Sequence, residues 1–218
     1  MVQVLERVGC EVSYNPEQTC CGQPAFNAGF IPECRSVAEK FIGDFGADDP
    51  IVAPSGSCVG FVRNYYGQLF TDGTLGRDDN LPVQTRVYEF TEFLVNVLGV
   101  IDVGASFPAK VTYHDACGAL RECKIKDAPR TLLQHVSGLE LTEALDCEVC
   151  CGFGGTFAVK FEPISIGMGE QKVLNAMSIG AEYIVSTDLS CLMHLDGYVK
   201  KHNHPIKVVH IADVLASI

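Results

Sequence analysis

The feature that most constrains this chain is a cysteine pattern that occurs twice. A Cys-Cys-Gly motif at 20–22 is followed by a Ser-Cys pair at 57–58, and second copies stand at 150–152 and 190–191. The eight residues that end in each Ser-Cys pair align without a gap, and each stretch begins with an apolar, strand-like run. The repeat period of about 130 residues is too long for a short-repeat solenoid. The pattern therefore predicts two copies of one domain.

The number of cysteines indicates metal or cluster ligation. The chain has eleven in 218 residues, an odd number, and no export signal precedes them. A secreted disulfide scaffold is usually shorter with an even count, whereas cysteine-rich intracellular chains more often bind metals or act in catalysis. The cysteines stand at positions 10, 20, 21, 34, 58, 117, 123, 147, 150, 151 and 191.

Charge and hydropathy argue against two kinds of partner. The formal net charge is −11, and Lys and Arg do not cluster. The chain therefore lacks the positive patch that binds a phosphate backbone, and we expect no nucleic acid partner. No apolar run approaches the ~18 residues of a membrane span, and the N-terminus lacks a basic segment followed by an apolar core. We therefore expect a cytoplasmic protein with no membrane span.

Helix-period and strand-period segments alternate along the chain, which favours an α/β fold with parallel sheets. We expect two pseudo-repeated, Rossmann-like halves, residues 1–105 and 106–218, divided where Gly104, Ser106 and Pro108 interrupt the pattern. Helical patterns occupy 33–46, 58–69, 87–98, 128–136, 168–179, 189–201 and 210–217. Strand patterns occupy 10–14, 50–54, 109–114, 139–142, 182–186 and 206–209.

The first half is expected to be truncated, without its opening strand and first cysteine. In the second half a predicted strand leads to Cys117, which stands 33 positions before Cys150. The same offset in the first half falls before Met1. A polar segment at 71–82 predicts a surface loop in this half.

The second half contains the first-choice ligand set, Cys117, Cys150, Cys151 and Cys191. Each stands at the end of a predicted strand or in the loop after it, and such ends meet at one edge of a parallel sheet. Four thiolates meet the requirement of an iron–sulfur cluster, and adjacent cysteines suit different irons of one cluster. A single zinc ion fits less well, because its ligands usually stand two to four residues apart. We predict an iron–sulfur cluster of the [4Fe-4S] type.

The first half offers a second-choice set, Cys20, Cys21 and Cys58. In both copies the glycine after the cysteine pair gives the backbone the freedom to direct N–H groups at the sulfurs. The glycine-rich loop at 151–155 lacks the Gly-Lys-Ser/Thr ending of a phosphate-binding loop, which argues against nucleotide binding.

The remaining cysteines allow other interpretations. Cys147 and Cys150 form a Cys-x-x-Cys pair, which a redox dithiol also uses, although this pair does not begin a helix as such motifs typically do. For Cys10, Cys34 and Cys123, a buried thiol acting as a small apolar side chain is the commoner explanation.

Two histidines stand near the predicted ligands. His114 and Asp115 precede Cys117 at a strand end, where they would either tune a cluster and move protons or bond the neighbouring loop. His194 lies one turn beyond Cys191 in a helical pattern and would face the same site. A helix histidine without a site role is the more frequent case.

Five segments, 17–26, 54–58, 113–117, 148–157 and 188–191, together resemble the cysteine-rich CCG domain family, most closely its lactate-utilisation protein A branch. The resemblance covers essentially the whole chain. More distant relatives include the cysteine-rich chain of heterodisulfide reductase and the iron–sulfur chain of glycolate oxidase. The family closes each repeat with Cys-x-x-Cys, whereas this chain has Ser55 and Asp188 at the first of those positions. The resemblance therefore implies four thiolates in the second half, with Asp188 as a candidate oxygen ligand.

The resemblance also implies a function. It predicts an iron–sulfur electron-transfer subunit of a multi-protein system that oxidises L-lactate to pyruvate, with the other subunits of that system as partners. Such a chain is a component of an oxidoreductase rather than a complete enzyme. Two alternatives stay open: a zinc- or thiol-stabilised interaction module without redox activity, and a catalytic subunit like that of heterodisulfide reductase.

Overall fold

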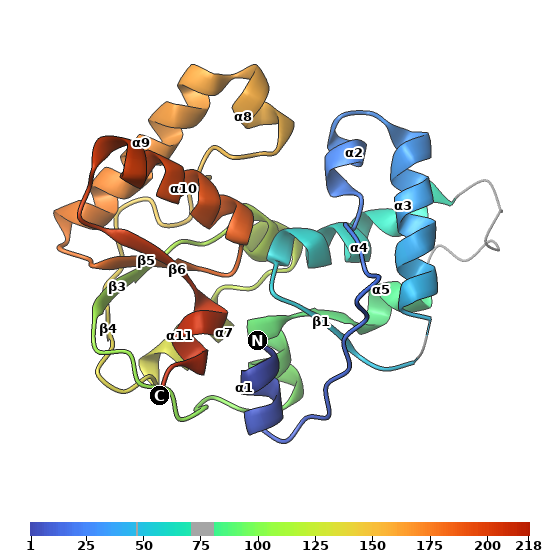
Figure 1. Ribbon diagram of the computed structural model, residues 1–218, viewed down its shortest axis with the longest axis horizontal. Coiled ribbons are helices and arrows are strands. Elements are labelled where there is room, and N and C mark those ends of the chain that lie inside the picture. The colour runs from blue at the N-terminus through green and yellow to red at the C-terminus, as the bar shows by residue number, and fades with distance from the viewer. Residues whose placement is uncertain (47, 71–80) are drawn as a thin grey trace.

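The computed structural model describes residues 1–46, 48–70 and 81–218 as an α/β protein with two parallel sheets. The N-terminal half lies mostly on the right of Figure 1 and the C-terminal half on the left, with both chain ends in the lower half of the view. The predicted fold class is thus confirmed. The surface loop expected at 71–82 lies almost entirely outside the described residues.

The second half contains a four-stranded sheet in the order β4-β3-β5-β6, with every pair parallel. Its strands are β3 (Lys110–Tyr113), β4 (Glu140–Leu141), β5 (Tyr183–Ser186) and β6 (Lys207–His210). Its helices are α7 (Asp127–Gln134), α8 (Thr156–Lys160), α9 (Glu162–Ser178), α10 (Leu189–His202) and α11 (Ile211–Ala216), with a π-helical turn, η2 (Gly118–Glu122), after β3.

Helices cover both faces of this sheet. Because successive strand residues point to opposite faces, Ile184 packs in a cluster with residues of α9 and α10, whereas Val185 packs with residues of α7 and α11. Apolar residues on both sides are expected of parallel strands between two helical layers. The carboxyl ends of β3 and β5 therefore open onto one edge of a doubly covered sheet.

The first half contains a two-stranded parallel sheet, in which Ile51 of one strand is the partner of Val87 of the other. The strands are β1 (Ile51–Ala53) and β2 (Val87–Glu89). The helices are α1 (Val2–Arg7), α2 (Gln23–Asn27), α3 (Ile31–Asp44), α4 (Gly56–Leu69), α5 (Pro82–Arg86) and α6 (Phe90–Glu92), which continues into a π-helical turn, η1 (Phe93–Val97).

One hydrophobic cluster joins residues from both sides of position 105. Val4 and Leu5 of α1 and Phe90 of α6 are buried together with Val111 of β3 and Leu215 of α11. The Arg7 guanidinium extends this contact by donating hydrogen bonds to the carbonyls of Val103, Leu215 and Ala216. The first helix of the chain is therefore held against its last helix.

One predicted strand was wrong, and one predicted helix begins three residues later than expected. Residues 10–14 form no strand. The corresponding strand of the second half, β4, pairs with β3. The described part of the first half has no strand equivalent to β3, so residues 10–14 have no partner to pair with. Residues 87–98 were expected to form one helix, but 87–89 pair with β1 as a strand, so pairing in the sheet overrides the helical pattern. The other predicted helices and strands have counterparts within a few residues of their expected bounds. No helix in the described part of the chain is long and apolar enough to cross a membrane.

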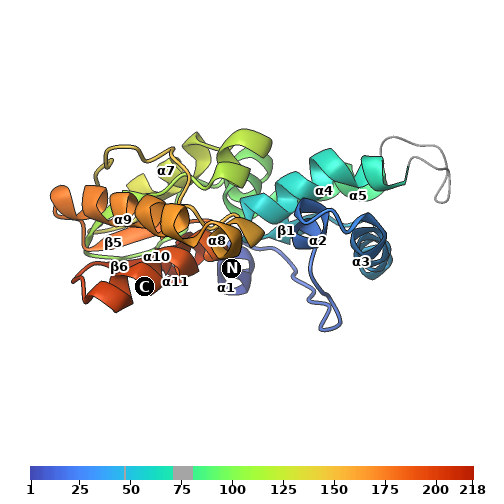
Figure 2. The same ribbon diagram turned by 90° about the horizontal axis from the view of Figure 1, so that it is seen from above.

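The two halves meet where α4 begins beside η2. A Cβ atom added to Gly56 would lie 2.4 Å from the Cβ of Ala119, and one added to Gly118 would lie 2.5 Å from the Cα of Ser57. Glycine on each side therefore allows the two backbones to approach more closely than other residues permit. Figure 2 shows α4 running from the middle of the molecule toward the far end of the first half.

Candidate metal centre

The structure brings together the four cysteines of the first-choice set. Cys117 follows β3 at the start of η2, Cys150 and Cys151 lie in the loop before α8, and Cys191 is the third residue of α10. Cys151 and Cys191 are buried, Cys117 and Cys150 are partly exposed, and all four are free thiols. Cys117 after β3 and Cys191 after β5 are therefore the two ligand candidates that accompany the Cys150–Cys151 pair.

These four thiols form a row in the order Cys117, Cys150, Cys151 and Cys191. The neighbouring Cys150 raises the pKa of Cys117, and Cys117 lowers the pKa of Cys150. The neighbouring Cys150 and Cys191 raise the pKa of Cys151. Four thiolates at this spacing repel one another, so they ionise together only when a cation or cluster compensates their charge. The donor set fits an iron–sulfur cluster, which is ligated by four cysteine thiolates.

The loop around the cysteine pair directs backbone N–H groups at the sulfurs. The Gly152 amide donates to Cys150 Sγ at 3.4 Å, and the Phe153 amide donates to Cys151 Sγ at 3.5 Å. Gly152 has a φ of +94°, and a Cβ there would lie 2.7 Å from the carbonyl oxygen of Ser165. Both the backbone angle and the close contact therefore require glycine at this position.

Positive electrostatic potential reaches the site from two sources. Cys191 lies in the first turn of α10, a 14-residue helix whose N-terminal end favours negative charge. The Lys172 ammonium is buried beneath the cysteine loop, where it donates to the carbonyls of Asp146 and Cys147. Burial lowers the pKa of Lys172, whereas negative charge on Cys147 or Cys151 raises it. Both features favour an anionic group at the cysteines.

His114 lies beside these cysteines. The sequence did not decide between such a position and a contact with the neighbouring loop. One ring nitrogen of His114 and the sulfurs of Cys151 and Cys191 all lie within 4.8 Å of one another. Burial lowers the pKa of His114 to about 3, and the nearby Lys172 ammonium adds to this effect. His194 is placed differently: it contacts the hydroxyl and carbonyl oxygens of Ser165 at 3.4 and 3.2 Å.

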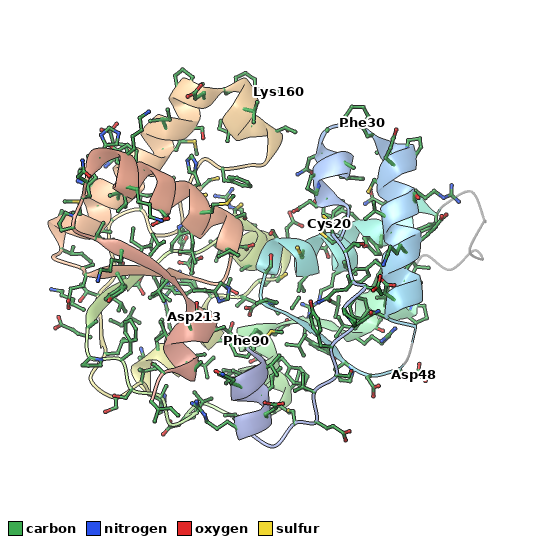
Figure 3. The ribbon with its side chains drawn as sticks, in the orientation of Figure 1. Cys20, Phe30, Asp48, Phe90, Lys160 and Asp213 are labelled. Carbon is green, nitrogen blue, oxygen red and sulfur yellow. The ribbon has the colours of Figure 1, made fainter. Side chains whose placement is uncertain are left out.

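The first-half cysteines repeat part of this geometry. Gly22 has the same φ of +94° as Gly152, and its amide donates to Cys20 Sγ at the same distance of 3.4 Å. The close approach of the Cys21 and Cys58 thiols raises the pKa of Cys21 and lowers that of Cys58. Figure 3 shows Cys20 between α2 and α4. This set has three thiols where the second half has four.

Cys34 also lies beside the first cysteine loop, although the sequence suggested only a buried apolar thiol. It is fully buried, and a Cβ added to Gly22 would lie 3.3 Å from its sulfur. Cys123 contacts the start of α4 instead, through a bond from its sulfur to the carbonyl of Gly56 at 3.3 Å. Burial raises the pKa of both thiols.

The Asp188 carboxylate, the candidate oxygen ligand, connects the two halves. Oδ1 accepts hydrogen bonds from the hydroxyls of Ser55 and Ser57, both at 2.7 Å, and Oδ2 accepts from the Ser57 amide at 3.2 Å. The Ser55 hydroxyl also accepts from the amide of Cys58. The two positions at which this chain differs from Cys-x-x-Cys therefore bond to each other across the interface.

Cys147 and Asp115 both take part in contacts that hold the loop before the cysteine pair. The Cys147 carbonyl accepts from the Asp115 amide at 3.1 Å, and burial raises the pKa of the Cys147 thiol. The buried Asp115 carboxylate forms a two-bond ion pair with the Arg130 guanidinium, at 2.8 and 2.7 Å. Arg130 also bonds Glu143, so this network fixes the loop that leads to the cysteine pair.

Comparison with known proteins agrees with the cysteine geometry. Residues 1–63 and 111–196 match the cysteine-rich domain named CCG. The chain is 46% identical over 216 residues to lactate utilization protein A of an Exiguobacterium species, covering 98% of this chain and 88% of that protein. The protein of the same name from Geobacillus thermodenitrificans is 42% identical over 214 residues, covering 98% of this chain and 89% of that protein. The chain therefore belongs to the cysteine-rich CCG domain family, in the group of the lactate utilization proteins A.

Proposed function

We propose that this protein is an iron–sulfur subunit that transfers electrons in a lactate-oxidising system. The observation that supports this most is the row of thiols formed by Cys117, Cys150, Cys151 and Cys191 at the end of a parallel sheet. The names of its relatives support the metabolic role, since proteins more than 40% identical to it are called lactate utilization protein A.

The four thiols of the second half are the proposed ligands of a [4Fe-4S] cluster. Cys20, Cys21 and Cys58 form the second candidate set, in which Cys34 lies close enough to take part. We leave Asp188 out of both sets, because its two oxygens already accept three hydrogen bonds from Ser55 and Ser57.

The protein's own groups would stabilise the anionic cluster. A bound cluster accepts and releases single electrons, at a potential set by hydrogen bonds, charge and exposure. The amides of Gly152 and Phe153 donate to the cysteine sulfurs, and the N-terminus of α10 adds a partial positive charge. Lys172 supplies a full positive charge from below. Each of these favours the additional negative charge of the reduced state.

The partners in this proposal are the other proteins of the lactate-oxidising system. Lactate oxidation to pyruvate releases two electrons and two protons, while a cluster moves one electron at a time, so a separate protein must bind lactate and take the electron pair. Eleven free cysteines suit a reducing compartment, and we place the protein in the cytoplasm for that reason.

Iron and sulfide analysis of two serine variants tests the proposal. In anaerobically purified protein, we expect Cys151→Ser to remove the second-half cluster, lowering iron and acid-labile sulfide together and removing its visible absorption. Cys151 stands between Cys150 and Cys191 in the thiol row, so serine in its place removes the central ligand candidate.

Cys10→Ser is the matched control, because Cys10 follows α1 and packs against the main hydrophobic cluster rather than at either cysteine loop. It should leave iron, sulfide and spectrum unchanged. An unchanged Cys151→Ser spectrum would refute the ligand set. Zinc without sulfide in the unmodified protein would instead support a structural interaction module.

A further inference from the structure

His114 is a buried imidazole that lacks hydrogen-bond partners. It is 2% exposed, and within the described part of the chain neither Nδ1 nor Nε2 has a partner. Leaving a buried polar group unpaired costs about 1–3 kcal/mol. Buried polar side chains normally have hydrogen-bond partners. An unpaired buried imidazole therefore indicates that its partner is a bound ligand rather than a protein atom.

The sheet fixes the position of this ring. The His114 amide donates to the Val185 carbonyl at 2.8 Å, and the His114 carbonyl accepts from the Ser186 hydroxyl at 2.9 Å. Both partners belong to β5, the strand that leads to Cys191. The backbone of His114 is therefore held at the centre of the sheet, directly before the loop that contains Cys117.

The surroundings of the ring match a metal-binding imidazole. One nitrogen lies within 4.8 Å of the sulfurs of both Cys151 and Cys191. An imidazole nitrogen beside two cysteine sulfurs is a donor set that metals use in proteins.

We propose that His114 is a metal ligand, donating a ring nitrogen to iron of the second-half cluster beside Cys151 and Cys191. This inference rests on the proposed function, because it assigns a ligand to the same cluster. The end of β3 then supplies two donors, His114 and Cys117, and the site has five protein donors: four thiolates and one imidazole.

A neutral nitrogen donor has a measurable consequence. An imidazole donor brings no negative charge to the iron, unlike a thiolate donor. With His114 bound, one iron environment differs from a purely thiolate-ligated one. Nitrogen hyperfine coupling from the ring is the direct signature of this bond.

Isotope-labelled histidine tests the proposal. The full chain is produced with ring-¹⁵N histidine and purified anaerobically, and pulsed electron paramagnetic resonance is recorded on the paramagnetic state of its cluster. We expect a ¹⁵N coupling from a directly bound nitrogen, its loss in His114→Asn, and its retention in His194→Asn. His194 is the matched control because it lies one turn beyond Cys191 but bonds Ser165.

The outcomes separate this inference from the proposed function. An iron–sulfur signal without ¹⁵N coupling, or a coupling that survives in His114→Asn, would overturn ligation by His114 while leaving the cluster intact. Absence of iron and sulfide would overturn the proposed function itself. If His114→Asn fails to fold, the labelled unmodified chain and His194→Asn still decide the question, since within the described residues the metal-binding group includes only this histidine ring.

Discussion

Lys172 places a buried positive charge beneath the second cysteine loop. Its ammonium donates to the carbonyls of Asp146 and Cys147 and lies close enough to Cys151 for that thiolate to raise the pKa of the lysine. A cation in this position stabilises a reduced cluster more than an oxidised one, because reduction adds negative charge. At the scale of single residues, Lys172 is therefore expected to tune the reduction potential.

Replacing Lys172 by methionine keeps the apolar stem and removes the charge. We expect a reduction potential lower by on the order of 50 mV, which corresponds to about 1 kcal/mol of lost charge interaction. Two carbonyls would lose their partner, at a cost of about 1–3 kcal/mol in the free energy of unfolding. Redox titration followed by electron paramagnetic resonance measures the first effect, and urea unfolding the second.

Lys160→Met is the control for this change. It removes the same charge from an exposed lysine at the end of α8, which Figure 3 shows at the outer edge of the molecule. Its potential should match that of the unmodified protein. Equal shifts in both variants would mean that net charge, rather than the position of Lys172, sets the potential.

Sequence reasoning selected the cysteines that the structure brings together, but not the residues around them. The two Cys-Cys-Gly motifs and their glycines have a local signature, and the matching φ and N–H···S bonds of Gly22 and Gly152 follow from it. The roles of His114 and Lys172 depend instead on burial, which spacing near a cysteine does not report. The one sequence signal for a buried lysine is the position of Lys172 on the apolar face of α9, beside Val173.

At the scale of elements, the contact of α4 with η2 determines how the two cysteine regions approach each other. Cys58 lies in the first turn of α4, and Cys117 directly precedes η2. The glycines at 56 and 118 allow backbone-to-backbone contact between these turns. A larger side chain at either glycine would separate both cysteines as well as the elements.

Gly56→Ala is therefore expected to be destabilising. Its Cβ would lie 2.4 Å from the Cβ of Ala119, so we expect the free energy of unfolding to fall by about 1–3 kcal/mol. Gly43→Ala provides the contrast, because Gly43 is exposed in α3 with nothing within 4 Å of the added Cβ. That change should stabilise by up to about 1 kcal/mol through helix propensity. Denaturant unfolding of both variants decides whether the close approach matters.

The two differences from the predicted elements show what a sequence pattern lacks. The segment 10–14 has strand character, but a strand needs a neighbour, and no described strand is available to it. The run at 87–98 has helical periodicity, yet its first residues gain hydrogen bonds from β1. The helix predicted at 58–69 is confirmed as α4, and Ser55 caps its N-terminus by accepting from the Cys58 amide.

At the scale of the whole molecule, polar contacts join the halves through reciprocal helix caps. Glu89 caps α6 in the first half and accepts from the Thr187 hydroxyl at the end of β5. His210 caps α11 in the second half and contacts the Pro54 carbonyl, after β1, at 3.0 Å. Each half therefore has one strand whose end contacts the other half. The packing of the two halves thus depends on the protonation of the buried Glu89 carboxyl group.

The Glu89 carboxylate makes stability depend on pH. Burial raises its pKa above the ordinary value of about 4.3, despite hydrogen bonds from Thr187 and Thr91. Because the folded state then holds the proton more tightly than the unfolded state, this contribution to stability is complete below pH ~4.3 and is lost as pH rises through the folded-state pKa. Urea unfolding across this range should show the decline.

Glu89→Gln removes the titration and isolates this effect. We expect its free energy of unfolding to fall less steeply with pH than that of the unmodified protein, by up to about 1.4 kcal/mol per pH unit within the titration range. A constant offset from altered hydrogen bonds is expected at every pH. Parallel pH profiles for the two proteins would show that Glu89 does not titrate between the folded and unfolded states.

The measurement that tests the central claim most directly is the metal and sulfide content of the unmodified, anaerobically purified chain. The four converging thiols of Cys117, Cys150, Cys151 and Cys191 predict iron and acid-labile sulfide in equal amounts, with a reducible electron paramagnetic resonance signal. A colourless protein that contains zinc and no sulfide would contradict electron transfer by an iron–sulfur cluster.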